Sequence, residues 1–398
     1  MKKLLYTALA ISLSLLAQGC NEDSSSTAPT PSPESSESTT VSSANVAIES
    51  SDANANLPNY SRAIQVNKML GHGINFGNAW ESGRGDYFKK IVYPDKVFDD
   101  DGDYWHNAIQ DEWFQIAKDA GFQSIRMPVR WNQTAELEPP YTLQAERVEG
   151  VKRHIKIANG LGMPVIINQH HYNELYLDPE GQMAKFYGMW ELIAEEFKDF
   201  DNDSLIFEVL NESRGPSDKY LAQMTDSAIK IIRKTNPGRT IMIDPGDFGK
   251  FELMEGFADI KDSNIIIDGH YYEPYSYSHQ GHNTECSKGV LWNPNDQQAL
   301  LKIVSDLKSY VATAKRIFPG KDGTSIPLNI GEFGASSVCE AEGQDDANRA
   351  PYIKAIIQTA NQLGYSWHIW GFTGVGFDIY NVNSGWYPEI LKVIQSNM

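Results

Sequence analysis

The chain has 398 residues and a formal net charge of −18, and 41% of its residues are hydrophobic. This length suits one large domain or two ordinary ones, and the hydrophobic share allows a sizeable core. The negative charge argues against nucleic acid and against an anionic membrane surface as partners, because both reward Lys and Arg.

The N-terminus has the layout of an export signal. Two lysines precede an apolar run from Leu4 to Leu16, which is too short to span a bilayer, and small residues then lead to Cys20. Residues 1–20 are therefore predicted to be a signal peptide, similar to lipoprotein signals in which the cysteine is lipidated. Ordinary cleavage near the same point is the alternative. We expect an exported protein, either a membrane-tethered lipoprotein at the outer membrane or cell surface, or a secreted one.

Residues 21–56 consist mainly of Ser, Thr, Pro, Glu, Ala and Asn. Such a segment buries too little apolar surface to offset the entropy of ordering, so we predict a disordered linker there. Residues 57–398 then form a single catalytic domain. With Cys20 set aside, Cys286 and Cys339 are the remaining cysteines, and they are candidates for a disulfide in an oxidising compartment.

The globular part alternates short apolar runs with amphipathic stretches. This alternation predicts a parallel sheet, and eight units favour a closed (β/α)8 TIM barrel, an α/β fold, over an open doubly wound sheet. Glycine-rich dinucleotide and phosphate loops are absent from the sequence. The predicted strands are 73–76, 124–127, 164–168, 205–210, 240–244, 265–269, 327–330 and 365–370, and the predicted helices are 111–120, 148–160, 183–197, 220–232, 298–317 and 350–363.

Polar residues gather where the predicted strands end. Glu212 ends the run that begins at Ile206, and Glu332 ends the run that begins at Leu328. Barrel enzymes build their active sites at these ends, and two facing carboxylates are the minimal equipment for hydrolysing a glycosidic bond. The other candidates at strand ends are Asn78, Glu81, Arg126, His170, His171, Asn211, His270, Tyr272 and Trp370.

Several of these segments resemble family 5 of the glycoside hydrolases, the family of many cellulases. The resemblance rests on Asn211-Glu212, His270-x-Tyr272, Gly331-Glu-Phe-Gly334 and the late Trp370. The stretches 73–78, 125–131, 167–172 and 270–281 also look like signature segments of that family, in a branch that contains endoglucanases and mannanases. Ser213 stands where the family usually has Pro, a departure that touches the loop and leaves the carboxylate intact.

The resemblance implies a retaining double displacement on a polysaccharide, without a cofactor, by a protein that we expect to be a monomer. Glu332 would be the nucleophile and Glu212 the acid/base, which stays protonated through burial and the negative charge of Glu332. Arg126 would hold Glu332 ionised, Tyr272 would donate to it, and His270 would orient the acid/base. Asn211 would form a hydrogen bond with the sugar 2-hydroxyl, and the sugar ring would stack on the indole of Trp370. His170 is a supporting residue, and Asn78, Glu81, His171 and Trp292 are predicted to contact substrate.

Each of these interpretations has an alternative. The alternative for Arg126 is a role only as an ion-pair partner inside the barrel. The alternative for Asn78 and Glu81 is a role as turn residues, and burial is an equal alternative for Trp80, Trp131 and Trp292. A structural role is favoured for Asp244 and Asp268.

We predict no metal at the adjacent histidines 170 and 171, because neighbouring side chains on a strand point to opposite faces. The functional alternatives are a β-1,4-mannanase, an inactive carbohydrate-binding barrel and a metal-dependent hydrolase.

Overall fold

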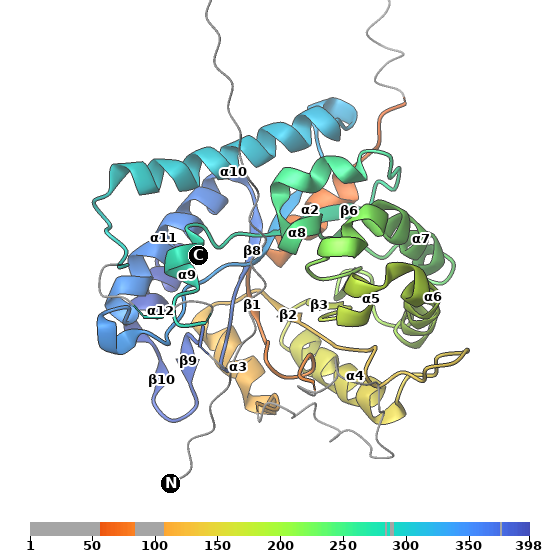
Figure 1. Cartoon of the computed structure of the whole chain (residues 1–398), viewed down its shortest axis with the longest axis horizontal. Helices are drawn as coiled ribbons and strands as arrows, with labels where there is room; N and C mark the ends of the chain where they lie inside the picture. The colour runs from red at the N-terminus through yellow and green to blue at the C-terminus, as the bar shows by residue number, and fades with distance from the viewer. Residues whose placement is uncertain (1–55, 84–106, 283–284, 287–289, 375) are drawn as a thin grey trace, which may run out of the picture. The chain divides into compact units, whose positions relative to one another are not determined.

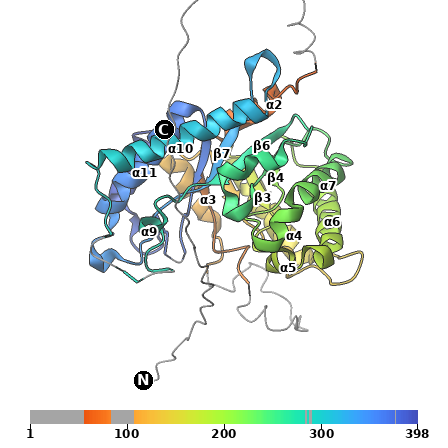
Figure 2. The same ribbon diagram turned by 45° about the horizontal axis from the view of Figure 1, so that its top comes forward.

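Eight parallel strands close into a barrel, and helices lie around it (Figures 1 and 2). Each strand pairs with the next in chain order, and β8 pairs back with β1 through His72 and Trp367 among others. The predicted TIM barrel is confirmed, and each predicted strand is present. The strands are β1 His72–Asn75, β2 Ser124–Met127, β3 Val165–Asn168, β4 Leu205–Glu208, β5 Ile241–Ile243, β6 Ile265–His270, β7 Leu328–Glu332 and β8 Ser366–Ile369.

This computed structural model describes residues 56–83, 107–282, 285–286, 290–374 and 376–398. The predicted signal peptide lies outside the described residues, and so does the predicted linker apart from its last residue. Within these ranges, no helix combines the length and apolar composition that crossing a membrane requires. The helices are α2 Ser61–Leu70, α3 Asp111–Ala120, α4 Ala145–Gly160, α5 Asn173–Leu177, α6 Pro179–Glu196, α7 Leu221–Arg233, α8 Gly246–Gly249, α9 Tyr275–Ser278, α10 Gln297–Ile317, α11 Asp346–Leu363 and α12 Pro388–Gln395.

Short elements connect these helices and strands. The 3-10 turns are η1 Gly215–Tyr220, η2 Phe251–Phe257, η3 Lys321–Gly323 and η4 Glu340–Glu342, and a small antiparallel pair is formed by β9 Tyr380–Asn381 and β10 Gly385–Trp386.

The helices begin and end where local chemistry directs them. In α3 the buried Trp113 and Phe114 face the core, and Gly121 ends the helix at φ 108°, a left-handed conformation that suits glycine. In α10 the Asp296 carboxylate accepts hydrogen bonds from the first free N–H groups. Capping by Asp178 starts α6 four residues before the predicted position, with Pro179 in its first turn.

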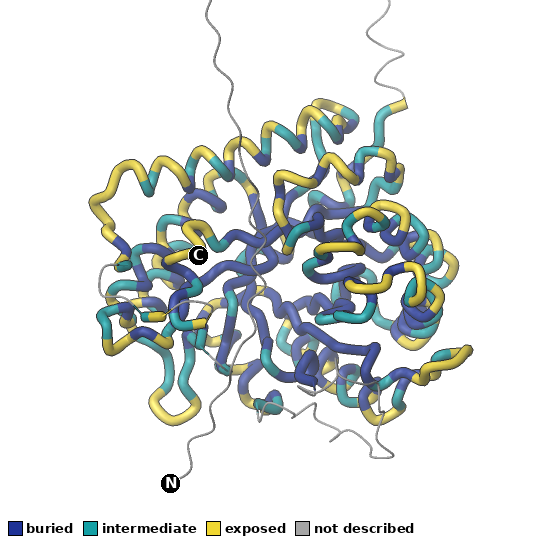
Figure 3. Tube along the Cα trace, viewed as in Figure 1, coloured by how far each residue is buried: buried dark blue, intermediate teal, exposed yellow. Residues whose placement is uncertain are grey.

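The barrel interior is built in layers. At the N-terminal end of the strands, Ile166, Ile206, Met242 and Ile266 form an apolar cluster that is closed by Ala63, Val66 and Leu70 of α2. Because side chains on a strand alternate with a period of two, the next inward positions are Asn168, Glu208, Asp244 and Asp268. All four are at most 2% exposed, and Figure 3 shows the backbone at the barrel centre as buried. A polar layer therefore lies directly on an apolar one.

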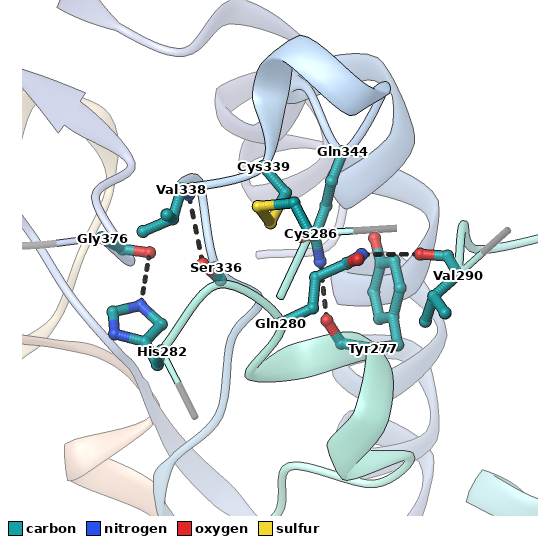
Figure 4. Close-up of a disulfide and its surroundings, with 10 residues drawn as sticks. All are labelled: Tyr277, Gln280, His282, Cys286, Val290, Ser336, Val338, Cys339, Gln344 and Gly376. Atoms are coloured by element: carbon teal, nitrogen blue, oxygen red, sulfur yellow. Dashed lines mark hydrogen bonds between the residues drawn. A yellow bond between two sulfur atoms is a disulfide. The ribbon is translucent and has the colours of Figure 1, made fainter. Parts of the chain in front are cut away.

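A disulfide joins two of the loops that follow the strands (Figure 4). Cys286 lies after β6 and α9, and Cys339 lies after β7, so the predicted pairing of these cysteines is confirmed. Hydrogen bonds tie the same loops together: Ser336 N–H donates to Ser278 O at 2.8 Å, and Gln344 Nε2 donates to Tyr277 O at 2.7 Å. These contacts fix the loops at the barrel end where Glu332 emerges.

Candidate active site

The guanidinium of Arg126 is the centre of the polar layer. It is fully buried and binds Glu208 with two hydrogen bonds, from Nε to Oε2 at 2.7 Å and from Nη2 to Oε1 at 2.8 Å. Its remaining N–H groups reach Glu332 Oε1 at 2.8 Å, Asn75 Oδ1 at 2.9 Å and Asn211 Oδ1 at 2.6 Å. All five donors of a guanidinium are thus engaged. Arg126 is therefore not only an ion-pair partner inside the barrel, because it also orients the carboxylate of Glu332.

Glu332 stands at the tip of β7 with its carboxylate held from two sides. Arg126 donates to Oε1, and the Tyr272 hydroxyl donates to Oε2 at 3.0 Å. The residue is 6% exposed. These two bonds fix the orientation of the carboxylate, as a nucleophilic group requires.

Glu212 follows β4, and its main chain adopts an unusual conformation. Its φ of 46° is left-handed, which costs a residue with a side chain on the order of 1–3 kcal/mol and is concentrated at functional sites. Asp244 Oδ2 accepts the Glu212 N–H at 2.7 Å, and Arg214 Nη1 donates to the Glu212 carbonyl at 3.0 Å. Oε1 of Glu212 meets His270 Nδ1 at 2.9 Å. The surrounding contacts therefore hold both the backbone and the carboxyl.

The two glutamates converge across the barrel end. One oxygen of Glu212, one of Glu332 and one nitrogen of His270 lie within 4.8 Å of one another. Retaining glycosidases separate their carboxyls by ~5–5.5 Å, whereas inverting ones leave ~6.5–9.5 Å for a water molecule. The spacing of one Glu212 oxygen and one Glu332 oxygen is at the short end of these distances.

The charges of this trio differ from the sequence-based expectation. Burial lowers the pKa of His270, but Glu332, Asp244 and the bond to Glu212 outweigh it and raise that pKa to about 10. Burial raises the pKa of Glu212, but the hydrogen bond and charge of His270 bring it down to about 2. For Glu332, burial raises the pKa, and His270 and Arg126 oppose the shift. The two pKa shifts favour a cationic His270 beside an ionised Glu212, whereas the sequence predicted a protonated Glu212.

Asn211 offers an unused donor beside the trio. Its Oδ1 is taken by Arg126, while its buried Nδ2 has no hydrogen-bond partner among the described residues. A buried amide without a partner loses free energy unless a ligand satisfies it. The geometry agrees with the predicted contact to a sugar hydroxyl.

Trp370 and His170 lie in parallel at the same barrel end. Their ring centroids are 6.1 Å apart with an interplanar angle of 4°, and Trp370 is half-buried. Gly77 allows the indole to lie there, because a Cβ at that position would come within 2.4 Å of the Trp370 ring. Burial first, and then the neighbouring His171 and Arg126, keep the pKa of His170 well below its usual range, so this ring is neutral.

The expectation for the paired histidines is wrong in one respect. Because β3 ends at Asn168, His170 and His171 lie in the loop that follows it. Their ring centroids are 4.2 Å apart, so the two side chains do not point to opposite faces. His171 is half-buried, has a φ of 51°, and its carbonyl accepts both Arg130 Nε and Nη2.

Two predicted substrate contacts are contradicted. Glu81 is fully buried, and its carboxylate accepts the backbone N–H groups of Asn78 and Ala79, so it is a turn residue. Trp292 is 5% exposed and packs against Tyr277 and Tyr352, which leaves no free ring face for a sugar. Burial also holds for Trp80 and Trp131, which are at most 1% exposed. Asn78 remains half-buried beside the turn, at a φ of 62°.

Sequence reasoning missed three residues of the site. Glu208 was hidden in an apolar strand, although a lone charge in a buried run signals an internal partner. Arg214 lies 4.0 Å from Glu212 Oε2, between the rings of Tyr176 and Phe248, and no motif marks it. Phe248 is 49% exposed at a φ of 65°, an exposed aromatic ring on the acid/base side.

Comparison with known proteins assigns the family. A model of the cellulase family, glycosyl hydrolase family 5, matches residues 90–375. The chain belongs to glycosyl hydrolase family 5. This membership accounts for two convergent glutamates at the ends of β4 and β7.

Individual relatives agree with the family. Endoglucanase A of Paenibacillus barcinonensis is 24% identical, over 84% of this chain and 90% of its own length. Endoglucanase H of Acetivibrio thermocellus is 27% identical over 67% of this chain, and the matched part is 27% of that longer protein. Structures of Thermotoga maritima Cel5A with mannotriose and with cellobiose each match with a TM-score of 0.72 and 29% identity, covering 83% of this chain and 99% of theirs.

Replacement of Arg126 by Lys tests the centre of this family 5 site. Lysine keeps the charge but cannot span Glu208, Glu332 and Asn211 at once, so we expect kcat on a soluble β-glucan to fall about 100-fold or more. Steady-state kinetics measure this. The matched control is Arg239→Lys, which alters another buried arginine, bound to the Leu205 carbonyl near the other end of the barrel. That variant should lose stability and keep kcat, and a wild-type kcat in Arg126→Lys would contradict the assignment.

The raised pKa of His270 predicts how stability depends on pH. The pKa of His270 is about 10 in the folded protein and 6.5 in the unfolded chain. Protonation of His270 therefore contributes fully to the free energy of unfolding below pH 6.5, and this contribution is lost as pH rises toward 10. For this nearly fully buried group, the loss should be on the order of a few kcal/mol. Denaturant unfolding between pH 6 and 10 should show the decline in wild type and a flatter profile in His270→Asn. The control His282→Asn removes an exposed imidazole and should keep the decline; equal slopes in all three proteins would refute the assignment.

Proposed function

We propose that the protein is an endo-acting β-1,4-glucanase that hydrolyses cellulose or related β-glucans with retention of anomeric configuration. The observation that carries the proposal is the approach of Glu212 and Glu332 to within 4.8 Å, together with His270. The endoglucanase relatives support the choice of a β-glucan as substrate.

The first step forms a bond between the enzyme and the sugar. A carboxylate oxygen of Glu332 attacks the anomeric carbon, the glycosidic bond breaks, and the leaving oxygen takes a proton from Glu212. His270 supplies that proton to Glu212 along their 2.9 Å hydrogen bond, because the His270 cation with ionised Glu212 and neutral His270 with protonated Glu212 are tautomers of one state. Arg126 and Tyr272 keep Glu332 aimed throughout.

The second step releases the sugar. Once Glu332 is esterified, its charge is gone, and Glu212 acts as a base that takes a proton from water. The resulting hydroxide oxygen bonds to the anomeric carbon and the ester to Glu332 breaks. Two displacements at one carbon restore the original configuration. Asn211 Nδ2 is placed to donate to a sugar hydroxyl during both steps.

A β-1,4-mannanase is the second candidate. It is favoured by one observation: Thermotoga maritima Cel5A, which matches over 83% of this chain, has been solved with mannotriose as well as with cellobiose. Glucose and mannose differ in the orientation of the 2-hydroxyl, so the choice between them depends on groups near Asn211.

Exchange of either glutamate tests the mechanism. Glu332→Gln and Glu212→Gln should each lower kcat/KM on carboxymethylcellulose by about 10³-fold or more, because each removes a group that acts in the transition state. Reducing-sugar release measures this. The control is Glu252→Gln, which alters a carboxylate of η2 that accepts a hydrogen bond from Tyr310 of α10, and it is expected to match wild type.

Two further arms of the same assay decide between the alternatives. Wild type should release sugar faster from carboxymethylcellulose than from β-mannan, and the reverse order would favour the mannanase. A chelator should leave the rate of hydrolysis unchanged. Loss of hydrolysis in the presence of the chelator would indicate a metal-dependent hydrolase. Hydrolysis by Glu332→Gln at the wild-type rate on every glucan and mannan would remove the mechanism, and a wild type without hydrolysis would leave a carbohydrate-binding barrel.

A further inference from the structure

We propose that Asp244, which follows β5, is a positioning residue that holds the acid/base Glu212 in its productive conformation. The inference rests on the proposed function, because it names the residue that fixes the acid of that reaction. Asp244 does not touch the reacting atoms and acts through the main chain of Glu212.

The hydrogen bond between these residues crosses from one strand end to the next. Asp244 Oδ2 accepts the Glu212 N–H at 2.7 Å, and Asp244 is only 2% exposed. Without this acceptor the N–H would lose a partner in a place where water has little access, which is costly for a backbone group. The bond therefore fixes the peptide that enters Glu212.

The conformation of Glu212 explains why such an anchor is needed. At a φ of 46° the residue is in a region that side-chain-bearing residues avoid, and surrounding contacts must hold it there. Asp244 fixes the N–H, and Arg214 fixes the carbonyl at 3.0 Å. A relaxed φ would swing the side chain away from His270 and from the glycosidic oxygen.

Asp244 also faces the ring that binds the acid. Its Oδ2 lies 4.0 Å from His270 Nε2, while His270 Nδ1 bonds Glu212. His270 Nε2 and Asp244 Oδ1 have no hydrogen-bond partner within the described part of the chain. Burial raises the pKa of Asp244 well above its usual range, and the charges of Asp268 and Glu208 add to this. The carboxyl can accept the N–H whether or not it carries a proton, so the anchor needs an oxygen and not a charge.

Comparison with Asp268 shows that the placement is specific. Asp268 occupies the equivalent inward position on β6, but its Oδ1 accepts from Asn329 and its Oδ2 lies 3.8 Å from Arg126. It serves the centre of the polar layer, whereas Asp244 serves the backbone of the acid.

The test uses two substrates that differ in their need for an acid. Departure of a sugar from cellopentaose requires a proton from Glu212, whereas dinitrophenolate leaves from dinitrophenyl β-cellobioside without one. In Asp244→Ala we expect kcat/KM to fall about 50-fold for cellopentaose and less than about threefold for the aryl glycoside, with KM nearly unchanged. Asp244→Asn keeps an acceptor oxygen and should restore both values to within about threefold of wild type.

The control is Asp262→Ala. It removes a partly buried aspartate that pairs with Arg233 ahead of β6, so it should lower stability without changing the substrate ratio. Hydrogen exchange gives a readout independent of activity, since the Glu212 amide proton should exchange faster in Asp244→Ala and at the wild-type rate in Asp244→Asn. If Asp244→Ala does not fold, Asp244→Ser, whose hydroxyl is too short to reach the N–H, takes its place with the same expectation.

The outcomes separate the two proposals. Equal losses on both substrates, or an Asn variant as impaired as the Ala variant, would overturn the role of Asp244 while wild-type activity upheld the glucanase. A wild type that hydrolyses neither substrate would overturn the glucanase, and the exchange rate of the Glu212 amide would still decide whether Asp244 anchors it.

Discussion

The structure of the site depends on one buried cation placed among more carboxyls than it can neutralise. Arg126 uses its two-pronged contact on Glu208 of β4, and its remaining donors reach Asn211 after the same strand, Asn75 of β1 and Glu332 of β7. Breaking the buried ion pair of Arg126 with Glu208 or Glu332 would cost about 3–5 kcal/mol. The guanidinium therefore fixes the relative positions of the strand ends, and this network orients the carboxylate of Glu332.

The second cation of the site is His270, which is charged only while its ring holds a proton. His270 lies among Glu212, Glu332 and Asp244, and their combined charge holds a proton on a buried ring. A proton stored there is one hydrogen bond away from the carboxyl that must deliver it. In the proposed mechanism, the permanent charge of Arg126 positions Glu332, and the proton of His270 serves Glu212.

Much of this arrangement was predictable from the sequence, and the omissions have physical causes. Short apolar runs between amphipathic stretches predicted the eight strands, and Glu212 and Glu332 were found because they end two of these runs. Glu208 and Asp244 lie at inward positions of those same strands, but a period says which side chains share a face and not which of them meet. Glu81 bonds the N–H groups of its own turn, and Trp292 packs against Tyr277 and Tyr352, contacts that sequence spacing does not record. The proton on His270 depends on three carboxyls from three strands.

The central claim is that Glu332 and Glu212 stand close enough for covalent catalysis, since their oxygens lie within 4.8 Å. Proton NMR of the first products released from cellopentaose, recorded before mutarotation, tests it most directly. The account predicts that the new reducing ends appear as the β-anomer, the configuration of the bond that was cut. Initial appearance of the α-anomer would show a single displacement by water and would contradict it.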